Sequence, residues 1–142
     1  MVNFLENDEN RPFAFVPMCA DPIHAGHINI LKEASRFGTV IVGLMTDEAM
    51  ISYKRHPVTS YKNRASVVEC LKMVDYVYPL DGIDYAKVAN KFKLDFFLHG
   101  DDWLENIQRD SRDNLIDAMK LWNGKVIDVK YTEGISSTSY YK

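Results

Sequence analysis

Residues 13–37 read FAFVPMCADPIHAGHINILKEASRF. The first part, Phe13 to Cys19, is an apolar run that predicts a buried strand. The last part predicts a helix from Ile23 to Phe37, because apolar residues recur at helical spacing at Ile28, Leu31, Ala34 and Phe37. The polar turn between these two elements holds two histidines, and the rest of the chain is interpreted around it.

The same alternation of apolar runs and helical stretches continues to residue 129. Strands are predicted at 13–19, 40–45, 76–80, 96–99 and 126–129. Helices are predicted at 23–37, from a cap at Thr46 or Asp47 to about Ser52, after an N-cap at Ser60, at 85–92 and at 112–122. This order predicts an α/β fold, a Rossmann-like doubly wound sheet of five parallel strands.

Composition bounds the class of protein. The 142 residues suit one domain, and we expect a polar leader at 1–12 followed by a single domain at 13–142. A net charge of −3 gives no basic surface for nucleic acid or an anionic membrane. The chain shows no signal peptide and no apolar run of membrane-spanning length, and two cysteines make no disulfide framework. We therefore expect a cytoplasmic protein.

His24 and His27 fall in the first turn of the predicted helix, where residues three apart lie on the same face. The N-terminal turn of a helix favours anions, so both rings could direct Nε2 donors at one phosphate, and Gly26 leaves room for close approach. A helix cap or half of a zinc site are the alternatives. Zinc would need further ligands, and the other histidines, His56 and His99, are distant in sequence.

Three further polar segments also follow predicted strands, at 54–57, 100–103 and 132–138. Lys54 and Arg55 are either a solvated loop or a basic arm that closes over a triphosphate. Arg64 lies early in a helix, where its charge opposes the helix dipole; this points to an anionic partner, and an exposed helix arginine is the alternative. Ligands bind at the carboxyl ends of strands in doubly wound sheets, so these segments are expected to share one site.

The segment Gly100-Asp101-Asp102-Trp103 combines a turn glycine, two carboxylates and an aromatic ring. It is either a capped loop with its indole in the core or a site where a carboxylate holds ribose hydroxyls or Mg²⁺. In the second interpretation the Trp103 indole packs on a ligand or attracts an amine.

The stretch Tyr131-Thr132-Glu133-Gly134-Ile135-Ser136-Ser137-Thr138 places three hydroxyl side chains after a glycine. Such a run caps a helix, and it also offers hydroxyl and backbone donors to phosphate oxygens. A plain N-cap would need only one hydroxyl.

The His-x-Gly-His signature at 24–27 resembles that of the nucleotidyltransferases, which include cytidylyltransferases and the pantetheine-phosphate and nicotinate-mononucleotide adenylyltransferases. GDDW, TEGISST and the SYKNR segment at 60–64 are similar to the glycerol-3-phosphate cytidylyltransferase type. MCADPIHAGH, ISYKRHP, HGDDW and YTEGISST resemble more closely the cytidylyltransferases of phosphonate metabolism, which stand alone or are fused to a phosphoenolpyruvate mutase. The fused relatives raise the expectation that this chain is part of a longer protein.

Two features depart from the pattern. Pro17 and Cys19 replace the glycine and the hydroxyl residue that relatives carry after the first strand, so one backbone donor is lost and a weaker donor is present. Tyr131 stands where the glycerol-type enzymes carry an arginine, which argues against glycerol-3-phosphate as the acceptor.

The resemblance implies transfer of CMP from CTP to a small phosphonate, such as 2-aminoethylphosphonate or 2-hydroxyethylphosphonate, with release of pyrophosphate. It assigns catalysis to His24, His27, Lys54 and Arg64, and an acceptor pocket to Trp103 and Tyr131. Nucleotide binding is assigned to Met18, Cys19, Ala20, Asp21, Gly26, Gly100, Asp101, Asp102, Thr132, Gly134, Ile135, Ser136, Ser137 and Thr138.

Mg²⁺ or another divalent cation is implied as the counter-ion of the triphosphate, with no protein ligands assigned to it, and a homodimer is the expected assembly. Glycerol-3-phosphate, phosphoethanolamine and phosphocholine are the alternative acceptors. An adenylyltransferase and an inactive nucleotide-binding module are the alternative functions, the second resting on Pro17 and Cys19.

Overall fold

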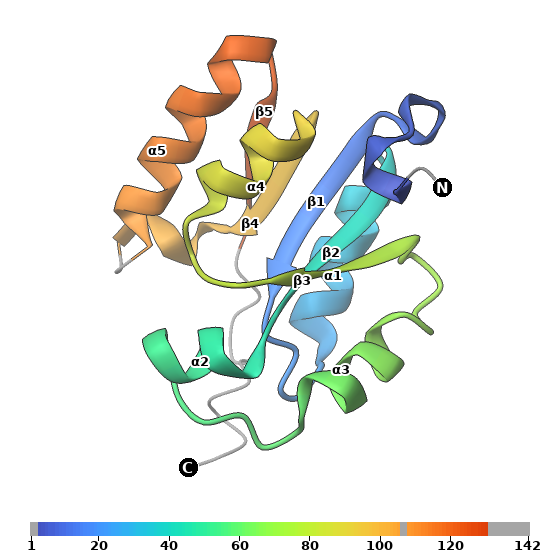
Figure 1. Ribbon diagram of the computed structural model, residues 1–142, viewed down its shortest axis with the longest axis vertical. Helices are drawn as coiled ribbons and strands as arrows, with labels where there is room; N and C mark the ends of the chain where they lie inside the picture. The colour runs from blue at the N-terminus through green and yellow to red at the C-terminus, as the bar shows by residue number, and fades with distance from the viewer. Residues whose placement is uncertain (1–2, 106–107, 131–142) are drawn as a thin grey trace.

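The computed structural model describes residues 3–105 and 108–130. Within them the strands form one parallel sheet in the order β3-β2-β1-β4-β5 (Figure 1). Its strands are β1 (Phe13–Met18), β2 (Thr39–Met45), β3 (Tyr76–Leu80), β4 (Phe96–Gly100) and β5 (Lys125–Val129). This order is that of a Rossmann-like doubly wound sheet, which confirms the predicted fold class.

The helices connect these strands as the sequence predicted. They are α1 (Ala25–Ser35), α2 (Asp47–Tyr53), α3 (Tyr61–Val68), α4 (Tyr85–Phe92) and α5 (Arg109–Met119), with short turns η1 (Phe4–Glu6), η2 (Asp8–Asn10), η3 (Asp101–Glu105) and η4 (Lys120–Trp122). Thr46 and Ser60 cap α2 and α3, because each side chain accepts from a backbone N–H of the first turn. Of the helices in these ranges, none has the length and apolar character needed to cross a membrane.

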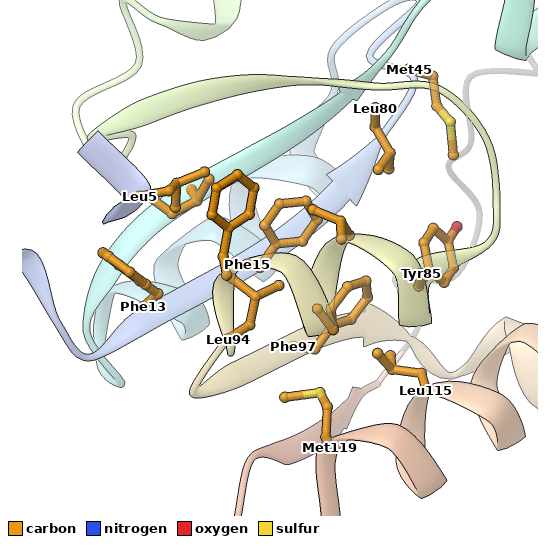
Figure 2. Close-up of a cluster of buried hydrophobic side chains, with 14 of the residues drawn as sticks. Leu5, Phe13, Phe15, Met45, Leu80, Tyr85, Leu94, Phe97, Leu115 and Met119 are labelled. Atoms are coloured by element: carbon orange, nitrogen blue, oxygen red, sulfur yellow. The ribbon is translucent and has the colours of Figure 1, made fainter. Parts of the chain in front are cut away.

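Two apolar clusters cover the two faces of the sheet. Successive β1 side chains alternate between them: Phe13 and Phe15 belong to one, and Ala14 and Val16 to the other. The first cluster packs beneath α4 and α5, where Tyr85, Leu115 and Met119 meet the strand residues (Figure 2). The second is covered by α1 and α3 on the opposite face (Figure 1). A sheet buried on both faces explains the near-continuous apolar runs of β1 and β2.

The segment before β1 packs on the domain from residue 3 onward. Leu5 is buried in the first apolar cluster, and the Phe4 ring stacks on Tyr76 with centroids 4.9 Å apart. Arg11 donates to the carbonyls of Phe92 and Lys93. This segment therefore contributes to the core despite its polar composition.

The neighbouring strands β1 and β4 pair only at their beginnings. Their register pairs Ala14 with Phe96 and Phe15 with Phe97, whereas the pairing of β1 with β2 continues to Met18. Pro17, which has no N–H to donate, lies beyond the last β1–β4 pair. The strand order changes direction between β1 and β4, and in doubly wound sheets the crevice at such a point is where ligands bind.

Candidate active site

His24 and His27 form a reciprocal cap at the start of α1. His24 is the N-cap, with extended φ and ψ of −151° and 179°, and its Nδ1 accepts from the Gly26 N–H at 3.0 Å. The Nδ1 of His27 accepts from the His24 N–H, also at 3.0 Å. The two ring centroids lie 3.9 Å apart. The helix therefore begins at Ala25, two residues later than the periodicity predicted, because His24 keeps the extended conformation of a cap.

This cap decides where each ring carries its proton. An Nδ1 atom that accepts a hydrogen bond is unprotonated, so the hydrogen of each neutral ring lies on Nε2. Burial lowers the pKa of His27 to about 3, helped by His24 and by the charge of Lys54. Burial and Lys54 also lower the pKa of His24. Both rings are thus neutral at pH 7, with Nε2–H as the donor of each.

Lys54 lies at the C-cap of α2 and is exposed. It reaches the histidine pair through space, since its charge contributes to the lowered pKa of both rings. His24 and His27 thus lie in contact, and the Lys54 charge acts on both rings; these are three of the four residues assigned to catalysis. Their arrangement places one positive charge and two neutral N–H donors at the carboxyl end of the sheet.

Arg64, the fourth of these residues, occupies a different position from the one expected. Its guanidinium is buried and donates to the carbonyls of Cys19, Met45 and Thr59 and to Asp47 Oδ1, each at 2.8 Å. These bonds join the end of β1, the end of β2 and the loop before α3. The structure therefore gives Arg64 a structural place between strand ends, and its assignment to the triphosphate stays a prediction.

Asp21 is also held by protein groups. It is fully buried, and its carboxylate accepts from Arg55 Nη1, from the Val58 N–H and from the Thr59 N–H. These partners lie 34 to 38 residues further along the chain. No local pattern around Asp21 identifies them, so sequence reasoning missed this contact.

Met18 is the last residue of β1, and Cys19 and Ala20 form the turn between β1 and Asp21; all three are buried. Ala20 has a φ of 53°, in the left-handed region that non-glycine residues seldom adopt. The Cys19 thiol lies 3.4 Å from the Tyr53 hydroxyl. Tyr53 was not singled out from the sequence, because its place at the end of α2 shows this contact only after folding.

The segment from Gly100 to Trp103 lies at the carboxyl end of β4, as predicted, but its parts differ in exposure. Asp102 is exposed and Asp101 half-buried, so both remain candidates for nucleotide contacts. Trp103 is fully buried, stacks on His99 with ring centroids 4.0 Å apart, and donates to Asp128 Oδ1 at 2.6 Å. A fully buried indole offers no face to an acceptor, so this ring belongs to the core and not to an acceptor pocket.

Two other expectations concern the C-terminal hydroxyl run and a metal site. Tyr131 and the stretch from Thr132 to Thr138, with Gly134, Ile135, Ser136 and Ser137, lie outside the described residues. Within 3–105 and 108–130, no three His, Cys, Asp or Glu side chains are grouped to hold a metal ion. The zinc interpretation of His24 and His27 therefore finds no third ligand in this part of the chain.

Comparisons with known proteins identify the family of this chain. The family model described as cytidylyltransferase-like matches residues 15–142. Ethanolamine-phosphate cytidylyltransferase of Arabidopsis thaliana is 34% identical over 126 residues, which is 84% of this chain and 29% of that protein. The bifunctional protein HldE of Gluconobacter oxydans is 33% identical over 129 residues, 87% of this chain and 26% of that protein. The chain thus spans less than a third of either relative.

Solved structures share the fold. The lipopolysaccharide core biosynthesis protein of Thermoplasma volcanium superimposes with a TM-score of 0.71 at 20% identity, over 85% of this chain and 98% of that one. Pantoate-beta-alanine ligase of Francisella tularensis gives a TM-score of 0.67 at 18% identity, over 92% of this chain and 65% of that one. At these identities the likeness concerns the fold alone.

Proposed function

Because this chain belongs to the cytidylyltransferase-like family, we propose that it transfers CMP from MgCTP to the phosphate of a small monoester, such as phosphoethanolamine, and releases pyrophosphate. The observation that carries the proposal is the pair of neutral histidines, His24 and His27, whose Nδ1 atoms are both engaged by backbone N–H groups. The Lys54 charge acts on both rings, which follow the carboxyl end of β1, the edge of the sheet where such folds bind ligands.

The chemistry requires no covalent intermediate on the protein. An oxygen of the acceptor phosphate attacks the α-phosphorus of CTP, the bond to the bridging oxygen breaks, and pyrophosphate leaves with that electron pair. Negative charge grows on the phosphate oxygens in the transition state. Neutral Nε2–H donors that are already oriented stabilise this charge without reorganising, and Lys54 adds a positive charge beside them.

The relatives bear on the acceptor. Ethanolamine-phosphate cytidylyltransferases from Arabidopsis thaliana and Mus musculus are 34% and 33% identical to this chain. These relatives support a phosphate ester of an amino alcohol better than the phosphonate that the motifs suggested. Phosphoethanolamine is therefore the acceptor we expect, and the phosphonates become competing substrates in its test.

The test is pyrophosphate release from MgCTP with phosphoethanolamine, phosphocholine, glycerol-3-phosphate, 2-aminoethylphosphonate and 2-hydroxyethylphosphonate offered one at a time. We expect the highest kcat/KM with phosphoethanolamine and a value at least about tenfold lower with ATP, a difference of about 1.4 kcal/mol. His27→Ala serves as the background control, because it removes one of the two Nε2–H donors.

Each other outcome replaces part of the proposal. Preference for a phosphonate would restore the acceptor that the motifs suggested, and preference for ATP would make the chain an adenylyltransferase. Binding of MgCTP without pyrophosphate release for any acceptor would favour an inactive nucleotide-binding module.

A further inference from the structure

The carboxylate of Asp21 ties the loop after β1 to the segment that follows α2. Its Oδ2 accepts from Arg55 Nη1 at 2.7 Å and from the Val58 N–H at 2.8 Å, and its Oδ1 accepts from the Thr59 N–H at 3.0 Å. The second amino group of Arg55 also donates to the Asp21 backbone carbonyl. One buried side chain thus fixes both ends of residues 55–59.

This segment begins directly after Lys54. The backbone N–H groups of Lys54 and Arg55 both donate to the Met50 carbonyl, at 2.9 and 3.0 Å, where α2 ends. Lys54 therefore sits between a helix terminus on one side and the Arg55 contact with Asp21 on the other. Since Asp21 precedes His24 by three residues, the same carboxylate links the segment that carries Lys54 to the turn that carries the histidines.

Arg64 fastens the far end of the segment to the same turn. Its Nε donates to the Thr59 carbonyl and its Nη1 to the Cys19 carbonyl, both at 2.8 Å. The segment 55–59 is thus held by two buried side chains of opposite charge, Asp21 and Arg64. The segment is fixed against the end of β1 at both of its ends.

We propose that Asp21 is a positioning residue, which fixes the segment next to Lys54 so that the Lys54 charge acts on the histidine pair, and that Asp21 does not itself bind the nucleotide. The catalytic importance of Asp21 rests on the proposed function, whereas its structural role in holding the segment 55–59 does not. A carboxylate that already accepts three hydrogen bonds and is fully buried has no exposed oxygen for ribose or metal. Its contact with Arg55 also neutralises a negative charge that would otherwise repel a triphosphate.

The charges in the site agree with this role. Burial raises the pKa of Asp21, but the hydrogen bonds from Val58, Arg55 and Thr59 together lower it below its ordinary value, so Asp21 is ionised at pH 7. The charge of Lys54 acts on both histidines in the opposite sense to a carboxylate. Displacement of Lys54 and loss of the Asp21 charge therefore shift the pKa of His24 in opposite directions.

The test uses Asp21→Asn, with the pKa of His24 followed by NMR in the absence of nucleotide. Lys54→Ala sets the scale, because removal of that charge raises the pKa of His24. If Asp21 holds Lys54, Asp21→Asn raises this pKa toward the Lys54→Ala value. An unchanged or lower pKa would overturn the proposal, since loss of the carboxylate charge alone shifts it downward.

Asp95→Asn is the matched control. Asp95 lies at the other end of β1 and accepts from Arg11 Nη1 at 3.0 Å and from the Phe13 N–H at 2.8 Å, the same kinds of donor. The Asp95→Asn variant should leave the pKa of His24 unchanged. An equal rise in Asp95→Asn would mean general loosening and would also overturn the proposal. If Asp21→Asn does not fold, Arg55→Lys keeps the charge but loses the fork, and a smaller rise is expected.

Kinetics give a second test. Asp21→Asn should lower kcat/KM for MgCTP about 10- to 100-fold, as expected when a catalytic group is displaced by about 1 Å. In the Lys54→Ala background the same change should cost less than about threefold, because Lys54 is the group through which it acts. If the double variant instead lost kcat/KM by the product of the two single losses, the positioning role would be contradicted. A raised His24 pKa in a chain without transfer activity would refute the proposed function and leave the position of Asp21 supported.

Discussion

The two ends of β1 carry the same kind of contact and use it differently. At the amino end, Asp95 accepts from Arg11 and from the Phe13 N–H. At the carboxyl end, Asp21 accepts from Arg55 and from two backbone N–H groups. Asp95 keeps 32% of its side chain exposed, whereas the Asp21 side chain is 0% exposed.

What each contact fastens explains the difference. Arg11 ties the first residues of the chain to the end of α4, where no residue assigned to the site lies. Asp21 ties the segment that follows Lys54 to the turn that leads to His24. The same chemistry therefore serves stability alone at one end and, in our proposal, the site at the other.

The largest effect should follow removal of Arg64 at the carboxyl end. Arg64→Ala removes the charged donor that the Cys19 and Met45 carbonyls share, so the free energy of unfolding should fall by about 3–5 kcal/mol. Urea unfolding measures this, and Arg64→Lys should recover part of the loss. A variant of full stability that has lost activity would instead return Arg64 to the triphosphate contact that the sequence suggested.

His27→Ala should lower kcat by about two to three orders of magnitude, the usual cost of one oriented donor to a developing negative charge. Pyrophosphate release from MgCTP measures it. Asp95→Asn is the control at the amino end and should remain close to the unmodified chain. Turnover near that of the unmodified chain in His27→Ala would remove this ring from the mechanism.

A lower pH should reduce the free energy of unfolding, because burial keeps the ring of His27, at the carboxyl end of β1, neutral in the folded chain. Its pKa is about 3 when folded because burial disfavours the charged ring, against an ordinary value of 6.5. The unfolded chain therefore binds the proton first, and stability that is fully present above pH 6.5 is lost as the pH falls toward 3. Between pH 7 and pH 5 this group should cost about 2 kcal/mol. Urea unfolding of His27→Asn should show a correspondingly shallower pH dependence, and parallel curves would contradict the assignment.

The smallest effect is expected at the amino end. Arg11→Met removes the donors to Phe92, Lys93 and Asp95 from a side chain that is 25% exposed, so stability should fall by about 1–2 kcal/mol. Activity should change by less than about twofold, within the ±0.5 kcal/mol usual for sites away from the chemistry. A larger kinetic loss would show that the two ends of β1 are coupled.

The fold could be predicted closely because its signals are local. The strand at 76–80 and the helix at 85–92 have the predicted limits, and the Thr46 and Ser60 caps act as expected. Local patterns also indicated the histidine pair. They did not show that Arg64 and Trp103 are buried, since an arginine beside a helix start and an aromatic after an acidic turn look alike in sequence whether buried or exposed.

The sequence by itself determined the order of elements, the helix start at the histidines and the family to which the motifs belong. Hydrophobic period and capping depend on neighbours within a few residues. Only the tertiary structure decided that Asp21 faces Arg55, that Arg64 joins two strand ends, and that Trp103 stacks on His99. The Asp21 and Arg64 contacts join residues up to 45 positions apart. Trp103 and His99 are close in sequence, but the packing of whole elements decides that their rings stack with Trp103 buried. Such contacts depend on how strands are ordered and paired, which no local pattern specifies.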